Sequence, residues 1–198
     1  MEQRTLVVLS GPSGSGKTTL QRELSRYGVG IIPNCTSRPR RKDDGADYLT
    51  LPRWQFVRPF RWWHTFLWIV RVGPHLYGTR RRDIASVDDV GAICLTPDLH
   101  VFGRLQDACD DRNIKLVFVF LTPPPVCELR RRMMERGTRP KEAFERALKE
   151  RTWYPAALEQ EQRGMVRWHF IAPGTPPQMA NKLFAALDWF PDLNGGSP

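Results

Sequence analysis

The sequence predicts an α/β fold in which a parallel sheet carries helices on both faces. Residues 6–9 form a short apolar run typical of a buried strand, and residues 19–24 have helical character. Residues 115–121 contain an unbroken apolar run, which favours a central strand of a parallel sheet. A chain of 198 residues can bury a substantial core as one domain. We therefore expect a single α/β domain over residues 1–198.

A phosphate-binding motif connects the first expected strand and helix. Residues 11–18, GPSGSGKT, fit the P-loop pattern G-x-x-x-x-G-K-[ST]. The glycines let successive backbone N–H groups turn toward an anion, and the following helix adds its positive N-terminal end. Lys17 is expected to reach the β- and γ-phosphates, and the Thr18 hydroxyl to bind Mg²⁺. The expected donor-site residues are Ser13, Gly14, Ser15, Gly16, Lys17, Thr18 and Thr19. The motif therefore predicts binding of a nucleoside triphosphate with Mg²⁺.

The composition favours anionic partners. The chain has 30 Lys and Arg residues against 21 Asp and Glu, which gives a net charge of +9. This charge alone does not tell whether the anionic partner is a nucleotide or a nucleic acid. The four cysteines form no C-x-x-C pair, so we expect buried free thiols rather than a zinc site or a disulfide framework. No signal-peptide pattern and no apolar run approaching 18 residues is present. We expect a soluble, cytoplasmic protein that does not bind membranes.

A second basic segment lies at residues 34–48. Several basic residues stand there among small hydroxyl residues and turn formers. The guanidinium fork of arginine suits a bidentate grip on phosphate. On composition alone, the segment is either a second anion site or a basic surface loop.

These stretches, taken together, resemble guanylate kinase. The segments that carry the resemblance are residues 11–20, Thr36–Arg38 with Arg41, Gly45, Asp47–Tyr48, Tyr77–Thr79, residues 116–124 and residues 129–138. The resemblance implies a P-loop kinase fold with an acceptor-binding insertion at residues 34–82 and a lid at residues 132–152. The implied acceptor-site residues are Ser37, Arg38, Arg41, Tyr48, Tyr77 and Thr79.

The resemblance also implies catalytic roles for arginines of the lid. Arg132 and Arg136 would stabilise the charge of the transferring phosphoryl group together with Lys17, which fits a reaction that depends on positioning and charge neutralisation. The family has a further arginine one position after Arg146, where this chain has Ala147. Arg146 and Arg151 are the candidates to replace it, and we favour Arg146. The alternative for each lid arginine is an exposed helix residue with an i,i+4 partner.

The acceptor insertion departs from the family. Residues 49–82 contain four tryptophans and no Asp or Glu. Trp68 takes the place of a glutamate that accepts hydrogen bonds from guanine in the family, and its indole offers only a stacking face and one donor. We therefore expect Trp68 in an acceptor site with altered base specificity. Packing of a small subdomain, or stacking on single-stranded nucleic acid, would also account for the tryptophans.

Asp98 is a further candidate for a residue that contacts Mg²⁺ or the acceptor. The family has two aspartates at the end of a strand here, and Thr96 replaces the first of them. Asp98 is expected to contact Mg²⁺, through water, or the acceptor. The alternative is a cap or turn residue at the strand end.

The predicted activity is transfer of the γ-phosphate of ATP to a nucleoside monophosphate. One alternative acceptor is a nucleotide within DNA or a sugar phosphate. A second alternative is a non-catalytic guanylate-kinase-like binding module, against which the intact Lys17 and Thr18 count.

Overall fold

The computed structural model describes residues 4–41, 44–57 and 65–189. The chain divides into two compact units. The first unit comprises residues 1–7, 29–93 and 98–116, and the second comprises residues 8–28, 94–97 and 117–198.

Within the described residues, the larger sheet has five strands in the order β2-β7-β1-β8-β9. Their bounds are β2 (Gly30–Ile31), β7 (Val90–Cys94), β1 (Arg4–Ser10), β8 (Ile114–Leu121) and β9 (Trp168–Ile171). β2 pairs with β7 in parallel, as β8 does with β9. β1 and β8 are strongly apolar because an interior strand of a parallel sheet is covered on both faces. The α/β fold is confirmed, and β8 is an interior strand as predicted.

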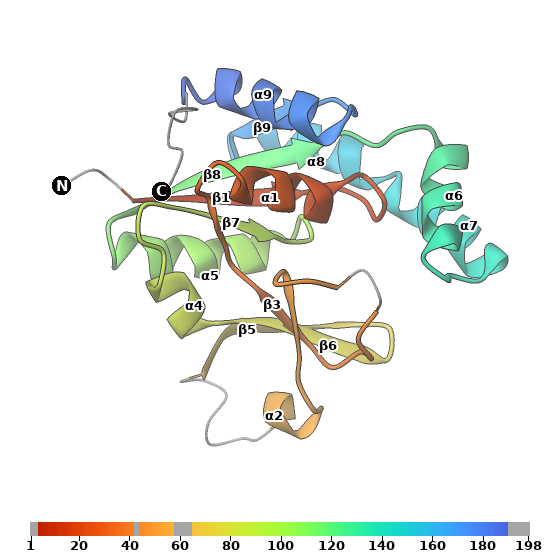
Figure 1. Ribbon diagram of the computed structural model, residues 1–198, viewed down its shortest axis with the longest axis horizontal. Coiled ribbons are helices and arrows are strands. Elements are labelled where there is room, and N and C mark those ends of the chain that lie inside the picture. The colour runs from red at the N-terminus through yellow and green to blue at the C-terminus, as the bar shows by residue number, and fades with distance from the viewer. Residues whose placement is uncertain (1–3, 42–43, 58–64, 190–198) are drawn as a thin grey trace. The chain divides into compact units, whose positions relative to one another are not determined.

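Among the described residues, five helices belong to the second unit. They are α1 (Lys17–Ser25), α6 (Val126–Glu135), α7 (Pro140–Glu150), α8 (Trp153–Gln162) and α9 (Pro176–Ala186). α1 and α9 lie side by side (Figure 1). Tyr27, which follows the end of α1, meets Phe184 of α9 edge to face with ring centroids 5.0 Å apart. α6 and α7 pack through a buried cluster, the lid cluster, formed by Leu129, Met133, Ala143 and Ala147. The segment expected to be the lid therefore has an apolar core of its own.

The first unit contains a second sheet in the order β4-β3-β6-β5. These strands are β4 (Tyr48–Thr50), β3 (Asn34–Thr36), β6 (His75–Arg80) and β5 (Phe66–Val72). The described part of this unit also contains the helices α2 (Trp54–Val57), α4 (Arg81–Ala85) and α5 (Leu99–Asp110). β3 and β4 are parallel, whereas β6 runs antiparallel to both β3 and β5. Cys35, Phe56 and Phe66 form a buried cluster in which the two rings stack with centroids 5.0 Å apart. The expected acceptor insertion is thus built around this small sheet.

Two expectations about buried residues have mixed outcomes. Among the tryptophans of residues 49–82, Trp68 is buried and Trp54 is 51% exposed, while Trp62 and Trp63 lie outside the described residues. Three of the cysteines are buried, as predicted, but Cys127 is exposed. The expectation of a buried thiol is wrong for Cys127 because it lies on the solvent side of α6.

In the described ranges, no helix combines the length and the apolar character needed to cross a membrane.

Candidate active site

The P-loop connects the end of β1 to the start of α1, in the order that the motif requires. α1 begins at Lys17, directly after Gly16, so the N-terminal end of the helix faces the loop. Gly11 has φ +135°, and a Cβ there would lie 2.6 Å from the carbonyl oxygen of Leu121. Only glycine fits at this position, because the conformation is strained for other residues and the space is taken by backbone. The strand, loop and helix predicted around residues 11–18 are confirmed.

Lys17 is folded back onto its own loop. Its Nζ donates to the carbonyl oxygens of Gly11 at 2.6 Å and Pro12 at 2.9 Å. Burial lowers the pKa of Lys17, and the nearby Arg136 and Arg146 lower it further, while Cys94 and Glu150 act in the opposite direction. The ammonium group therefore lies inside the loop, where it can exchange carbonyl oxygens for phosphate oxygens.

Ser15 presents a polar atom without a partner. Its side chain is buried, and its Oγ has no hydrogen-bond partner among the described residues. Buried polar atoms without partners are rare in folded proteins and call for an explanation such as a bound ligand or water. The unpaired hydroxyl of Ser15 agrees with the expectation that this loop binds phosphate oxygens.

Two lid arginines reach the P-loop. Arg132 of α6 donates from Nη1 to the Gly14 carbonyl oxygen at 2.9 Å and from Nε to Glu128 at 2.7 Å. Hydrogen bonds from Arg131 and then Arg132 lower the pKa of Glu128 to about 2, so this carboxylate stays ionised and orients Arg132. Arg146 of α7 donates from Nη2 to Ser13 Oγ at 2.6 Å.

Arg146, rather than Arg151, contacts the loop. Ala147, at the position where the family has its arginine, is 0% exposed and belongs to the lid cluster. An arginine side chain at 147 would point into that cluster, whereas position 146 points to Ser13. Arg151 is exposed after the end of α7. The geometry agrees with the preference for Arg146, whose catalytic role stays a prediction.

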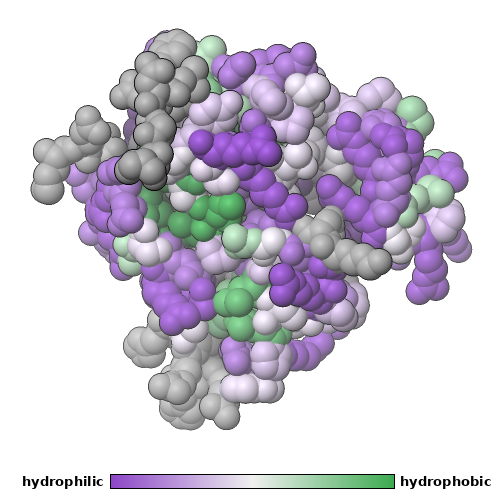
Figure 2. All heavy atoms as spheres, in the orientation of Figure 1, coloured by the Kyte–Doolittle hydropathy of each residue, from purple (hydrophilic) through white to green (hydrophobic). Residues whose placement is uncertain are grey.

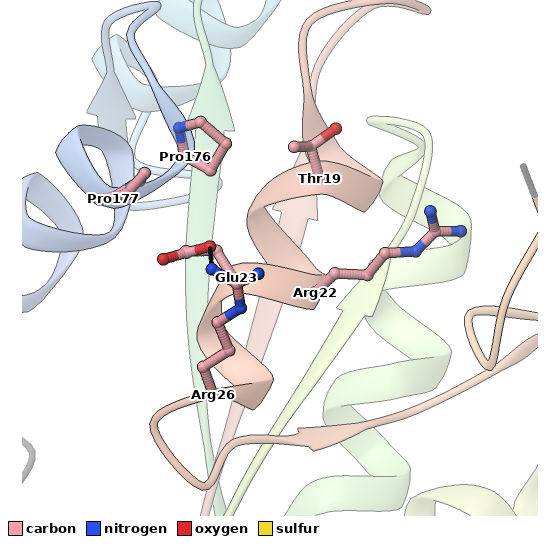
Figure 3. Close-up of a pocket in the computed structure, with 6 residues that line it drawn as sticks. All are labelled: Thr19, Arg22, Glu23, Arg26, Pro176 and Pro177. Carbon is pink, nitrogen blue, oxygen red and sulfur yellow. Dashed lines mark hydrogen bonds and ion pairs between the residues drawn. The ribbon is translucent and has the colours of Figure 1, made fainter.

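Two adjoining cavities lie beside the P-loop within the second unit. The first, of about 220 Å³, is lined by Gly14, Gly16, Thr19, Arg132, Arg136, Gly174, Pro176 and Met179. The second, of about 340 Å³, is lined by Thr19, Arg22, Glu23, Arg26, Pro176 and Pro177 (Figure 3). Thr19 and Pro176 border both. The expected lid arginines Arg132 and Arg136 therefore share a cavity with P-loop residues.

Thr18 is the residue expected to hold Mg²⁺ at this site. Among the described residues, no group of three or more His, Cys, Asp or Glu side chains could hold a metal ion. The hydroxyl of Thr18, in the first turn of α1, is the protein ligand that the motif supplies. A hard cation of this kind commonly uses few protein ligands and several phosphate or water oxygens. The residues present fit that mode of binding.

In the first unit, Arg38 and Asp44 form a buried ion pair. Arg38 Nη1 and Nη2 donate to the two carboxylate oxygens of Asp44, each at 2.6 Å, and the Arg41 backbone N–H donates to Asp44 at 2.8 Å. The Arg38 guanidinium also lies over the ring of Tyr48, 4.7 Å from its centroid. Although burial raises the pKa of Asp44, the hydrogen bonds from Arg38 and Arg41 hold it below its usual range. The guanidinium fork expected to grip a phosphate thus holds a carboxylate of the same chain.

Ser37 joins two strands of the small sheet. Its backbone N–H donates to the Leu76 carbonyl at 2.9 Å, and its Oγ accepts from the Leu76 N–H at 2.9 Å. Tyr77, the next residue, pairs with Thr36 across β3 and β6. Ser37 and Tyr77 therefore lie close to each other, and their contact with an acceptor stays a prediction.

A row of side chains crosses all four strands of the small sheet. Asn34 pairs with Tyr48, and Trp68 pairs with Thr79. Thr79 Oγ1 donates to Asn34 Oδ1 at 3.1 Å, which joins the two halves of the row. Paired residues share one face of a sheet. Tyr48, Thr79 and Trp68, three residues expected in the acceptor site, therefore lie in one line with Asn34.

Trp68 ends this row with an unused donor. It is 5% exposed, and its Nε1 has no hydrogen-bond partner among the described residues. The side chain is thus not an exposed stacking platform, and its one polar atom is buried without a partner among the described residues.

Asp98 caps α5. Its side chain accepts from the backbone N–H of His100 at 2.9 Å and of Val101 at 3.4 Å. This is the capping role that the sequence left open as the alternative. A contact with Mg²⁺ or acceptor stays a prediction.

Several residues near the expected sites are not predicted from the sequence. Asp44, Glu128 and Glu150 are carboxylates that hold the expected arginines, and Gly174 and Met179 line a cavity. The only signal for Glu128 and Glu150 is their spacing, four residues from Arg132 and Arg146. Such spacing is common on any helix surface, so it does not single out a site.

Comparison with known proteins agrees with the resemblance to guanylate kinase. The sequence pattern of the guanylate kinase family matches residues 3–159. Guanylate kinase from Thermotoga maritima is 33% identical over 137 residues, covering 67% of this chain, and the chain spans 64% of that protein's length. Guanylate kinase from Halalkalibacterium halodurans is 32% identical over 151 residues, 74% of this chain and 72% of that protein. The crystal structure of guanylate kinase from Anaplasma phagocytophilum shares the fold with a TM-score of 0.59 at 21% identity, covering 95% of this chain and 86% of the other.

Proposed function

The chain belongs to the guanylate kinase family, and from this premise we propose that it transfers the γ-phosphate of ATP, with Mg²⁺, to a nucleoside monophosphate with altered base specificity. The observation that carries the proposal is the meeting of Lys17, Arg132 and Arg146 at one P-loop. Phosphoryl transfer depends on positioning and on neutralising the charge of the transferring group. Three cationic side chains at the loop supply both.

The donor half of the mechanism follows from these contacts. Backbone N–H groups of the P-loop would cradle the donor phosphates, and Thr18 would hold Mg²⁺, which neutralises phosphate charge when bound. Lys17 would turn from the carbonyls of Gly11 and Pro12 to phosphate oxygens. Arg132 and Arg146 would move from loop oxygens to the transferring group. Arg136, which lines the cavity beside the P-loop together with Arg132, would add further positive charge.

The acceptor half rests on the first unit. Arg38 already forms a bidentate pair with a carboxylate, which is the geometry with which arginine also binds phosphate. Arg41, Tyr48 and Tyr77 are proposed to complete the phosphate grip. Trp68 supports the altered base specificity, because its indole N–H can only donate, whereas the N–H edge of guanine requires an acceptor.

The test is a screen of ATP consumption with different acceptors. Ribonucleoside and deoxyribonucleoside monophosphates, sugar phosphates and oligonucleotides would be compared, with Lys17→Ala as the blank and Lys182→Ala, an exposed lysine of α9, as the matched control. We expect turnover with nucleoside monophosphates and no strong preference for GMP. Efficient turnover of GMP with strong discrimination against AMP would contradict the altered specificity.

Two other results would replace the proposal. Turnover only with oligonucleotides or sugar phosphates would move the activity to the alternative acceptors. Absence of both ATP binding and turnover would favour a non-catalytic binding module.

A further inference from the structure

Glu150 places a carboxylate in the P-loop. The residue ends α7 and is 6% exposed. Its Oε2 accepts from the backbone N–H of Ser13, and its Oε1 accepts from Ser13 Oγ at 3.0 Å and from Arg146 Nη2 at 3.2 Å. Ser13, Arg146 and Glu150 thereby form a closed set of hydrogen bonds between the loop and the lid.

A carboxylate can satisfy the same donors as a phosphate. Both groups are anions that accept charge-assisted hydrogen bonds from backbone N–H groups and from arginine. Ser13 lies within the motif whose N–H groups cradle phosphate, and Arg146 is a proposed ligand of the transferring group. Glu150 therefore accepts hydrogen bonds from the Ser13 N–H and the Arg146 guanidinium, the groups that the bound nucleotide would use.

Binding a triphosphate beside the Glu150 carboxylate would be electrostatically unfavourable, because both groups are negatively charged. Two like charges at short range repel strongly when they are shielded from water, as the buried Glu150 is. The single positive charge of Arg146 cannot neutralise both the Glu150 carboxylate and the donor phosphates. Nucleotide binding must then displace the carboxylate from Ser13 or accept the repulsion.

We propose that Glu150 competes with the donor phosphates for Ser13 and Arg146 and so weakens the binding of ATP. The carboxylate holds α7 on the loop while no nucleotide is bound, and the nucleotide has to release it. The inference rests on the proposed function, because it requires that ATP bind at this P-loop.

The test measures ATP affinity after removal of this single charge. Glu150→Gln keeps the size and the hydrogen-bonding capacity of the side chain, and Glu145→Gln removes an exposed carboxylate from the same helix as the matched control. The dissociation constant for ATP with Mg²⁺ would be measured by isothermal titration calorimetry. We expect E150Q to bind ATP at least about fivefold more tightly than wild type, in the range of ordinary coupling between sites. E145Q is expected to bind like wild type.

The possible results separate this inference from the proposed function. Equal or weaker ATP binding by E150Q, with normal thermal unfolding and with kinase turnover by wild type, would overturn the competition alone. Absence of ATP binding in every variant would overturn both proposals.

Discussion

At the scale of single residues, Trp68 combines burial with an unused donor. The side chain is 5% exposed and stands in register with Thr79, whose hydroxyl is bound to Asn34. An unpartnered buried N–H costs free energy of about 1–3 kcal/mol. A ligand atom that accepts this hydrogen bond would recover part of that free energy, and a base edge that only donates would not. Trp68 is therefore the residue at which base specificity can be tested directly.

We predict that Trp68→Glu increases the preference for GMP over AMP. A carboxylate at this position would accept hydrogen bonds from guanine, which the indole cannot do. The ratio of kcat/KM for GMP to that for AMP should rise by at least about tenfold, because hydrogen bonds made inside a site discriminate strongly. Trp54→Glu, which changes an exposed tryptophan, is the control. An unchanged ratio in a folded W68E variant would contradict the assignment.

The Arg38–Asp44 pair makes a prediction about pH. The pKa of Asp44 lies below its usual range in the folded chain, so the pair stabilises the fold at pH values above the unfolded pKa of about 3.9. This contribution is lost as the pH falls through the lower, folded pKa. Asp44→Asn should reduce the free energy of unfolding at pH 7, and the difference from wild type should shrink below about pH 4.

Urea unfolding at pH 7 and pH 3 would measure this difference. Asp88→Asn, which changes an exposed aspartate, is the control and should show no such pH dependence. A difference between wild type and D44N that stays constant down to pH 3 would argue against the ion pair.

At the scale of elements, the lid helices are held by their own apolar cluster. Leu129 and Met133 of α6 meet Ala143 and Ala147 of α7. The helical period then directs Arg146 to the loop and exposes Leu148. Figure 2 shows mostly hydrophilic residues over α6 and α7, with a few hydrophobic ones among them. The cluster therefore decides which arginine reaches the P-loop.

We predict that restoring the family arginine by Ala147→Arg destabilises the lid. Position 147 is 0% exposed, so the longer side chain would overpack the cluster or bury a charge without a partner. The expected loss is about 2 kcal/mol of unfolding free energy, measured by urea denaturation. Leu148→Arg, at the exposed neighbouring position, should change stability little. Equal stability of A147R and wild type would show that the cluster can open for a second arginine.

At the scale of the whole molecule, each unit binds its own carboxylate at an expected phosphate site. Asp44 occupies the guanidinium of Arg38 in the first unit, and Glu150 occupies Ser13 and Arg146 in the second. The net charge of +9 favours anions in general, but these two pairs show where positive charge and N–H donors are gathered. In the proposed reaction, substrate phosphates would have to replace both carboxylates.

The sequence by itself determined the P-loop, the parallel sheet and the family. These features depend on local order, since residues 11–18 need only the strand before them and the helix after them. The tertiary structure decided the rest. Asp98 caps a helix, Arg146 rather than Arg151 meets Ser13, and the Thr79–Asn34 contact joins strands 45 residues apart. Such contacts depend on packing and strand register between distant segments, and neither can be predicted from the residues on either side.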